Sequence, residues 1–276
     1  MLVCTWVSAQ TARAPRRIIS LIPAATEMLF AIGSGPQVVA VGSFDTYPPQ
    51  VRRLPKIGAL LDPDVEKMLS LKPDLVVVYA SQDDLKAKLT RAGIPIYAYR
   101  HAGLQDVPAT IRSLGARTGH AADADAVASQ IERGLDAIRA KVAGRPRPRT
   151  LLVFGRERLA LRGIYVSGGR GFLDDMLRVA GGENVFADVQ QESLQATTEQ
   201  ILARRPDVIL EIRAASSAWP YAERQAEVHT WSALGSIPAV RNGRVQFLVD
   251  DRLVIPGPRI VEGTRLLAQA LHPESF

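Results

Sequence analysis

A unit of helix, turn and strand occurs twice in this sequence. EKMLSLKPDLVVVY begins at Glu66 and EQILARRPDVILEI begins at Glu199, and both the glutamates and the [KR]PD triplets align at one offset of 133 residues. A helix, a Pro-Asp turn and a strand can follow one another by chance, but the coincidence of glutamates and triplets favours a true repeat. The duplication therefore predicts two similarly folded lobes.

A single long helix is predicted between the two copies. Its apolar residues recur at the helical period of 3.6 residues and define one face. They are Val127, Ile131, Leu135, Ile138 and Val142. At 1.5 Å per residue a helix over residues 121–142 is roughly 30 Å long, about the width of a small domain. We interpret it as a rigid connection between two lobes that enclose a ligand; the alternative is a surface helix of one larger α/β domain.

Predicted strands alternate with helices of about ten residues on both sides of the long helix, which is typical of βαβ units around parallel sheets. The chain has 276 residues, enough for two domains of ordinary size. The expected fold class is α/β, with central parallel sheets in two lobes joined by one long α-helix. We place the N-terminal lobe at residues 15–120, the interdomain helix at 121–144 and the C-terminal lobe at 145–276.

The first 14 residues, MLVCTWVSAQTARA, are similar to the end of a secretory signal peptide. Ala12-Arg13-Ala14 fits the small-x-small pattern that precedes a cleavage point. A basic beginning and a full apolar core are missing, which suggests a start further upstream. Cys4 is the only cysteine, so no disulfide can form within the chain. We expect export to the periplasm; a lipid anchor at Cys4 and a cytoplasmic N-terminus are the weaker alternatives.

Composition and motifs exclude several classes of function. No apolar run reaches the roughly 18 residues of a membrane span. The formal charge of +6 includes the basic run 145–149, but no nucleic-acid motif accompanies it. No GxSxG motif is present, the glycines at 168–171 lack a phosphate-binding spacing, and no two histidines have a zinc-ligand spacing. We therefore expect no catalytic residues, no metal site, no cofactor and no nucleic-acid partner.

Several short segments follow one another between about Arg16 and Leu271. They are RIISLIPAATEMLFAIG, DTYPPQ, LDPDVEKMLSLKPDLVVV, SGGRGFLDDMLRVAGGENVFAD, TTEQILARRPDVIL and PGPRI. In this order and spacing they resemble the periplasmic substrate-binding proteins of ABC importers for cobalamin and ferric siderophores, the class III proteins with a helical backbone. The resemblance implies two Rossmann-like lobes joined by one rigid helix. SLIPAATE and DTYPPQ most resemble the cobalamin-binding branch.

The resemblance also implies roles for individual residues. Tyr47 and Tyr79 match aromatic residues that hold the corrin ring, and Asp251 matches a carboxylate that contacts the ligand. The sequence departs from the cobalamin branch at Leu60 and Ser193, where that branch has tryptophans. A glutamate on each lobe of these proteins pairs with arginines of the membrane permease. The matching residues, and the expected docking sites, are Glu66 and Glu199.

Ligands of open α/β sheets bind beyond the carboxyl ends of the strands, so we expect a site walled by both lobes. The expected ligand contacts are Pro23, Ala24, Tyr47, Leu60, Tyr79, Arg100, Arg156, Arg170, Arg213, Asp251 and Arg252. Arginine forks suit the phosphate of a corrinoid or the acidic groups of a chelate.

The expected function is capture of a metal chelate, first of all a corrinoid (cobalamin), by a monomer that delivers it to a permease dimer with its ATPase. A ferric siderophore or haem in the same role is the alternative. A Rossmann-like α/β enzyme with an organic cofactor is the alternative of another class.

Overall fold

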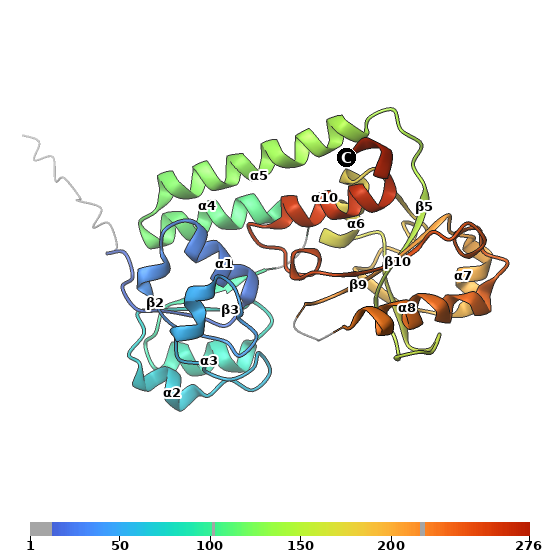
Figure 1. The fold of residues 1–276 in the computed structure, drawn as a ribbon. Coiled ribbons are helices and arrows are strands. Elements are labelled where there is room, and N and C mark those ends of the chain that lie inside the picture. The colour runs from blue at the N-terminus through green and yellow to red at the C-terminus, as the bar shows by residue number, and fades with distance from the viewer. Residues whose placement is uncertain (1–12, 101–102, 216–218) are drawn as a thin grey trace, which may run out of the picture.

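The computed structural model describes residues 13–100, 103–215 and 219–276. Within them the chain forms two α/β lobes, and one long helix passes from the first lobe to the second (Figure 1). The fold class predicted from the duplication is confirmed. Residues 1–12 of the predicted signal-peptide remnant lie outside the described part of the chain.

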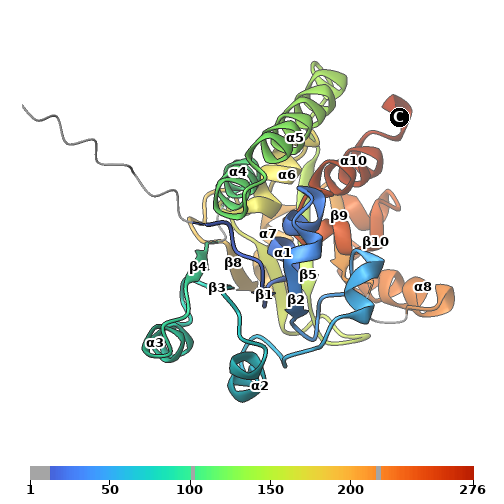
Figure 2. The ribbon, with the colours of Figure 1, turned by 90° about the vertical axis from the view of Figure 1, so that its left-hand side faces the viewer.

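The N-terminal lobe has a four-stranded parallel sheet in the order β2-β1-β3-β4. Its strands are β1 (Ile18–Ser20), β2 (Val38–Val41), β3 (Leu75–Tyr79) and β4 (Ile96–Tyr99). Its helices are α1 (Pro23–Ala31), α2 (Val65–Ser70), α3 (Asp83–Arg91) and α4 (Asp106–Thr118), with short 3-10 turns η1 (Gly35–Gln37) and η2 (Pro49–Arg53). In Figures 1 and 2, α1 and α4 lie on one side of the sheet, and α2 and α3 lie on the other.

The connecting helix α5 (Ala121–Val142) has the predicted length, and no proline interrupts it. Four of the five predicted face residues are buried, and the fifth, Val127, is half-buried. Two glycines let neighbouring helices approach it closely. A Cβ at Gly115 of α4 would lie 2.2 Å from the Cβ of Ala124, and one at Gly134 of α5 would lie 2.7 Å from Val261. The connection is therefore a packed layer of helices rather than an isolated rod.

The C-terminal lobe has a six-stranded sheet in the order β10-β9-β5-β6-β8, with β7 also paired to β5. Its strands are β5 (Arg149–Gly155), β6 (Ile164–Ser167), β7 (Glu183–Asn184), β8 (Ser193–Ala196), β9 (Val208–Arg213) and β10 (Val245–Val249). Its helices are α6 (Phe172–Val179), α7 (Thr198–Arg204), α8 (Tyr221–Thr230), α9 (Pro238–Arg241) and α10 (Ile260–Leu271), with 3-10 turns η3 (Trp231–Leu234), η4 (Asp251–Leu253) and η5 (Pro273–Ser275).

This second sheet is parallel at its centre, as predicted, and also contains an antiparallel strand. Strands β10, β9, β5 and β7 are parallel, whereas β6 is antiparallel to both β5 and β8. The connection from β5 to β6 contains only residues 156–163. A parallel crossover needs a dozen or more residues, so this short loop can only return the chain in the opposite direction.

The duplication is visible in the structure of both copies. The first residue of each triplet has a left-handed backbone, with φ 47° at Lys72 and 48° at Arg205. The aspartate of each triplet accepts a hydrogen bond from the main-chain N–H beside the first strand of its lobe. The pairs are Arg17 with Asp74 at 2.7 Å and Arg149 with Asp207 at 3.1 Å. The same turn is therefore fixed to the amino end of the first strand in each lobe.

One apolar core continues through both lobes. It includes Ile18 of β1, Ile131 of α5, Leu177 of α6, Ile212 of β9 and Leu267 of α10, all buried. A second cluster, around the buried rings of Phe186 and Trp231, covers the other face of the C-terminal sheet. Across the described ranges, no helix combines the length and apolar character that a membrane crossing requires.

The loop after β2 buries an acidic side chain. Asp45 is 2% exposed, and neither carboxylate oxygen has a hydrogen-bond partner among the described residues. Lys56 donates to the main-chain oxygen of Asp45 at 2.6 Å. A hydrogen bond from the hydroxyl of Thr26 to Asp45 would lower the pKa of Asp45. In this structure, however, that hydroxyl donates to Ser20 at 2.8 Å. Burial raises the pKa of Asp45 to about 6.

Replacing Asp45 tests this burial. Between its ordinary pKa of 3.8 and the value of about 6, the folded protein holds a proton that the unfolded chain has lost. The free energy of unfolding should therefore fall by on the order of 2–3 kcal/mol from this group as the pH rises through that window. We expect Asp45→Asn to remove this part of the pH dependence of the free energy of unfolding, measured by urea unfolding at pH 4, 5, 6 and 7.5. The exposed Asp62→Asn is the control, and parallel pH curves for wild type and Asp45→Asn would contradict the prediction.

Candidate functional site

The carboxyl ends of the parallel strands form the sheet edge at which open α/β folds bind ligands. The residues that directly follow these strands are Leu21, Gly42, Ala80 and Arg100 in the N-terminal lobe, and Arg156, Ala214 and Asp250 in the C-terminal lobe. Most of the predicted contacts lie at or close to these positions, at the carboxyl edge of each sheet.

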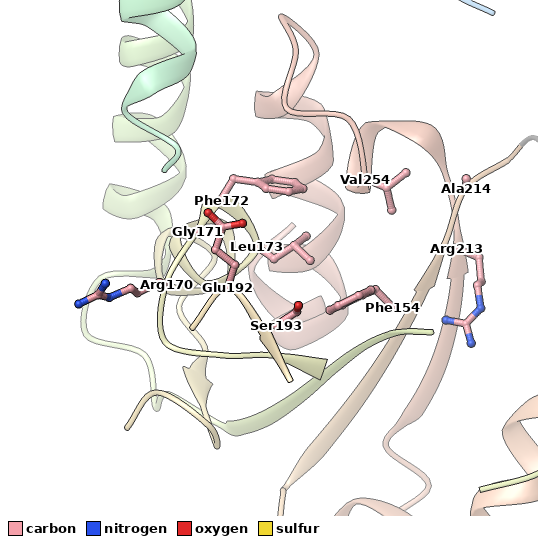
Figure 3. A pocket seen from close by; sticks show the side chains of 10 residues that line it. All are labelled: Phe154, Arg170, Gly171, Phe172, Leu173, Glu192, Ser193, Arg213, Ala214 and Val254. Atoms are coloured by element: carbon pink, nitrogen blue, oxygen red, sulfur yellow. The ribbon is translucent and has the colours of Figure 1, made fainter. Parts of the chain in front are cut away.

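A cavity of about 410 Å³ opens at this edge of the C-terminal lobe. Its lining residues are Phe154, Arg170, Gly171, Phe172, Leu173, Glu192, Ser193, Arg213, Ala214 and Val254 (Figure 3). Two of the predicted contacts, Arg170 and Arg213, are among them, as is Ser193. Figure 3 shows the guanidinium of Arg170 pointing away from the other lining side chains. The wall itself is therefore largely apolar.

Arg156 has a different role from the predicted one. Its side chain has no exposed surface, and it pairs with Glu211 at 3.0 Å and with Glu227 at 2.7 Å. It also donates to the main-chain oxygen of Glu227 at 3.0 Å. A buried cation with all these partners is a structural element of the lobe, and this structure leaves Arg156 no exposed surface for the predicted ligand contact.

Two further predicted arginines are already paired. Arg213 forms an ion pair with Glu211, whose carboxylate also accepts from the indole of Trp231 at 3.0 Å, and burial lowers the pKa of Arg213. Arg252 donates two side-chain hydrogen bonds to the carboxylate of Asp250, at 2.8 Å and 2.6 Å. Because each guanidinium has a carboxylate partner, neither is a free positive charge available to an anionic ligand.

Arg100 and Arg170 retain more freedom. Both are exposed; Arg170 donates to Gln190 at 3.1 Å, and Arg100 forms no hydrogen bond or ion pair within residues 13–100, 103–215 and 219–276. Asp251 accepts a hydrogen bond from the main-chain N–H of Ala215 at 2.8 Å. This carboxylate therefore fixes the segment after β9, next to the cavity.

The predicted aromatic residues lie in the N-terminal lobe. Tyr47 is 42% exposed in the loop after β2. Tyr79, at the end of β3, is half-buried, and burial raises the pKa of its hydroxyl. Its ring lies edge-on to that of Tyr99, with 5.5 Å between the ring centroids. Leu60 is half-buried, and its main-chain oxygen accepts from Gln82 at 2.7 Å. Tyr47 thus offers more ring surface to a ligand than Tyr79 does.

The start of α1 offers less surface than expected. Pro23 is half-buried, but Ala24 is only 4% exposed. The loop after β2 and the loop before α2 instead expose apolar side chains that were not predicted as ligand contacts. Phe44 is 67% exposed beside Tyr47, and Leu61 is 95% exposed beside the predicted Leu60. Their position next to predicted contacts was the available signal.

Sequence reasoning also missed the two rings that line the cavity. Phe154 is the next-to-last residue of β5, and Phe172 is the first residue of α6. Phe154 could have been found by its place at the carboxyl end of a strand, where ligands of this architecture bind. Phe172 lacks such a signal because the fold of the preceding glycine-rich turn decides where its ring lies.

The two docking candidates occupy equivalent positions. Glu66 is the second residue of α2 and Glu199 is the second residue of α7, and both are exposed. A carboxylate in the first turn is favoured by the positive end of the helix dipole. Main-chain hydrogen bonding, with help from the hydroxyl of Thr197, lowers the pKa of Glu199.

Possible metal ligands do not gather in this structure. Within the described parts of the chain, no group of three or more His, Cys, Asp or Glu side chains could hold a metal ion. The arrangement at the sheet edges can bind and orient a ligand through apolar contact and a few polar groups.

Comparison with known proteins agrees with this geometry. A family model described as periplasmic binding protein matches residues 18–251. An uncharacterized ABC transporter substrate-binding lipoprotein of Bacillus subtilis (strain 168), YvrC, is 32% identical over 95% of this chain and 82% of its own.

Two solved structures are similar over nearly their full length. The periplasmic vitamin B12 binding protein BtuF of Vibrio cholerae is 27% identical with a TM-score of 0.79, over 93% of this chain and 96% of that one. The periplasmic heme-binding protein RhuT of Roseiflexus sp. RS-1, in apo form, is 27% identical with a TM-score of 0.78, over 95% and 99%. The sequence match and the two-lobe fold together show that this chain belongs to the periplasmic binding protein family.

Proposed function

We propose that the protein is the substrate-binding component of an ABC importer and that it captures a metal chelate of low net charge, in the first place a corrinoid. The observation that carries the choice of ligand is the pairing of the arginines. Arg156, Arg213 and Arg252 all have carboxylate partners, so three of the five arginines that were expected to make the wall cationic are already neutralised.

The chemistry of the wall favours this class of ligand. A strongly anionic ferric catecholate would need free cations to replace its lost hydration, because an unpaired charge is expensive to desolvate. A corrinoid carries amide arms and one phosphate, so it needs polar partners and a broad apolar contact. Phe154, Phe172 and Leu173 supply the apolar contact on one lobe, and Tyr47 and Phe44 supply it on the other.

Haem in the same role is the second candidate. The same apolar cavity supports it, and Arg100 and Arg170 are exposed arginines that suit its two carboxylates. Similarity to the structure of a heme-binding protein supports it as well. A characteristic haem absorption band on titration with haemin would favour this candidate over a corrinoid.

Calorimetry on the purified protein tests the ligand. We expect saturable heat with cyanocobalamin and none with a ferric tris-catecholate. Phe154→Ala should weaken the binding of cyanocobalamin by about tenfold, since one aromatic contact contributes roughly 1–2 kcal/mol. Tyr221→Ala, which removes a ring that is 73% exposed outside the cavity lining, is the matched control. Tight binding of the tris-catecholate without a response to cyanocobalamin would contradict the proposed ligand class.

We also propose that Glu66 and Glu199 dock the protein on the permease. Their support is the equivalent, exposed position at the start of α2 and α7, one in each copy of the repeat. A dimeric permease presents the same surface twice, so two similar lobes can each meet one subunit.

A charge reversal separates docking from ligand binding. Glu66→Arg with Glu199→Arg should abolish ligand uptake through the cognate permease in reconstituted vesicles and leave the affinity for ligand unchanged, because neither side chain lines the cavity. Asp84→Arg with Glu274→Arg makes the same change in net charge at other exposed positions and should transport normally. Normal uptake by the Glu66 and Glu199 double variant would refute the docking role.

A further inference from the structure

An ion pair between a buried carboxylate and a half-buried guanidinium joins the two lobes. Glu27 lies in α1 of the N-terminal lobe, and Arg259 immediately precedes α10 in the C-terminal part of the chain. The guanidinium donates two hydrogen bonds to the carboxylate, at 2.9 Å and 2.5 Å. This bidentate geometry fixes both the distance and the relative orientation of the two side chains.

The surroundings of Glu27 make this pair hard to replace. Glu27 is 3% exposed, and burial raises its pKa while the bonds and charge of Arg259 oppose that change. A Cβ at Gly257 would lie 3.1 Å from a carboxylate oxygen of Glu27, so the segment before Arg259 packs closely against it. Loss of the guanidinium would leave this buried carboxylate without its partner, which is strongly unfavourable.

The same guanidinium also contacts the predicted ligand loop. Its central carbon lies 3.9 Å from the centre of the Tyr47 ring. A cation at this distance over an aromatic face is attracted by the ring and restricts its orientation. Arg259 therefore touches two elements of the N-terminal lobe at once, the helix α1 through Glu27 and the loop after β2 through Tyr47.

We propose that Arg259 is a positioning residue, which sets the spacing of the lobes through Glu27 and holds the Tyr47 ring in the orientation that a ligand meets. The part that concerns Tyr47 rests on the proposed function, whereas the part that concerns lobe spacing does not. A change in lobe spacing would move Arg259 relative to Tyr47, so the ligand loop and the lobe contact are coupled through one side chain.

Distances between spin labels test lobe spacing without any ligand. Labels at Lys88→Cys in α3 and Asn242→Cys after α9, in a Cys4→Ser background, report on the two lobes from exposed positions. We expect one narrow distance distribution in the otherwise unchanged protein.

Variants of the ion pair should lose that narrow distribution. Arg259→Lys keeps the charge but loses the planar fork, and Glu27→Gln keeps the shape of the carboxylate but loses its charge. Both should broaden the distribution or add a second population, with circular dichroism confirming that each variant is folded. Arg265→Lys, the same substitution at an exposed position of α10, is the control. An unchanged distribution in both folded variants would overturn the role in lobe spacing.

A double-mutant cycle tests the role toward Tyr47. We expect Arg259→Lys and Tyr47→Leu each to weaken the binding of cyanocobalamin, and the double variant to lose no more affinity than Tyr47→Leu alone, because Arg259 acts through that ring. If the fold-losses of affinity of the two single variants multiply in the double variant, Arg259 does not act through Tyr47. That result would overturn the proposed role of Arg259 toward the Tyr47 ring. If the unchanged protein binds no corrinoid, the proposed ligand fails, and the spin-label distances still decide the role in lobe spacing.

Discussion

The packing of one helix layer against both lobes is the constraint on which this structure depends. Helix α5 cannot bury its apolar face alone, so it packs against α4 on one side and α10 on the other, at Gly115 and Gly134. The resulting core runs without interruption from β1 to α10. Two lobes with a common core have little freedom to separate, and the Glu27–Arg259 ion pair restricts them further.

Charge compensation at the sheet edges determines the chemistry that the proposed site can offer. Three arginines that stand at or near strand ends are held by Glu211, Glu227 and Asp250. Such pairs orient the loops beside the cavity and leave little net charge for a ligand to neutralise. The protein therefore combines a basic overall composition with a largely apolar cavity wall, and its net charge of +6 says little about the ligand.

Local patterns predicted much of the fold and part of the candidate site. The period of the apolar residues predicted α5, and the aligned triplets predicted two lobes whose turns at Lys72 and Arg205 have nearly the same backbone. The direction of β6, which is antiparallel to both of its neighbours, was missed because strand direction depends on which strands pair. Phe172 was missed because a glycine-rich turn places its ring.

By itself, the sequence determined the duplicated α/β architecture, the connecting helix and the matching positions of Glu66 and Glu199, because these follow from short-range periodicity and from a repeat within the chain. Only the tertiary structure decided which arginines are free. Arg156 meets Glu211 across 55 residues, and Arg259 meets Glu27 across 232 residues. Folding brings these charges together, and a guanidinium that a buried carboxylate already holds cannot also serve as a free charge for a ligand.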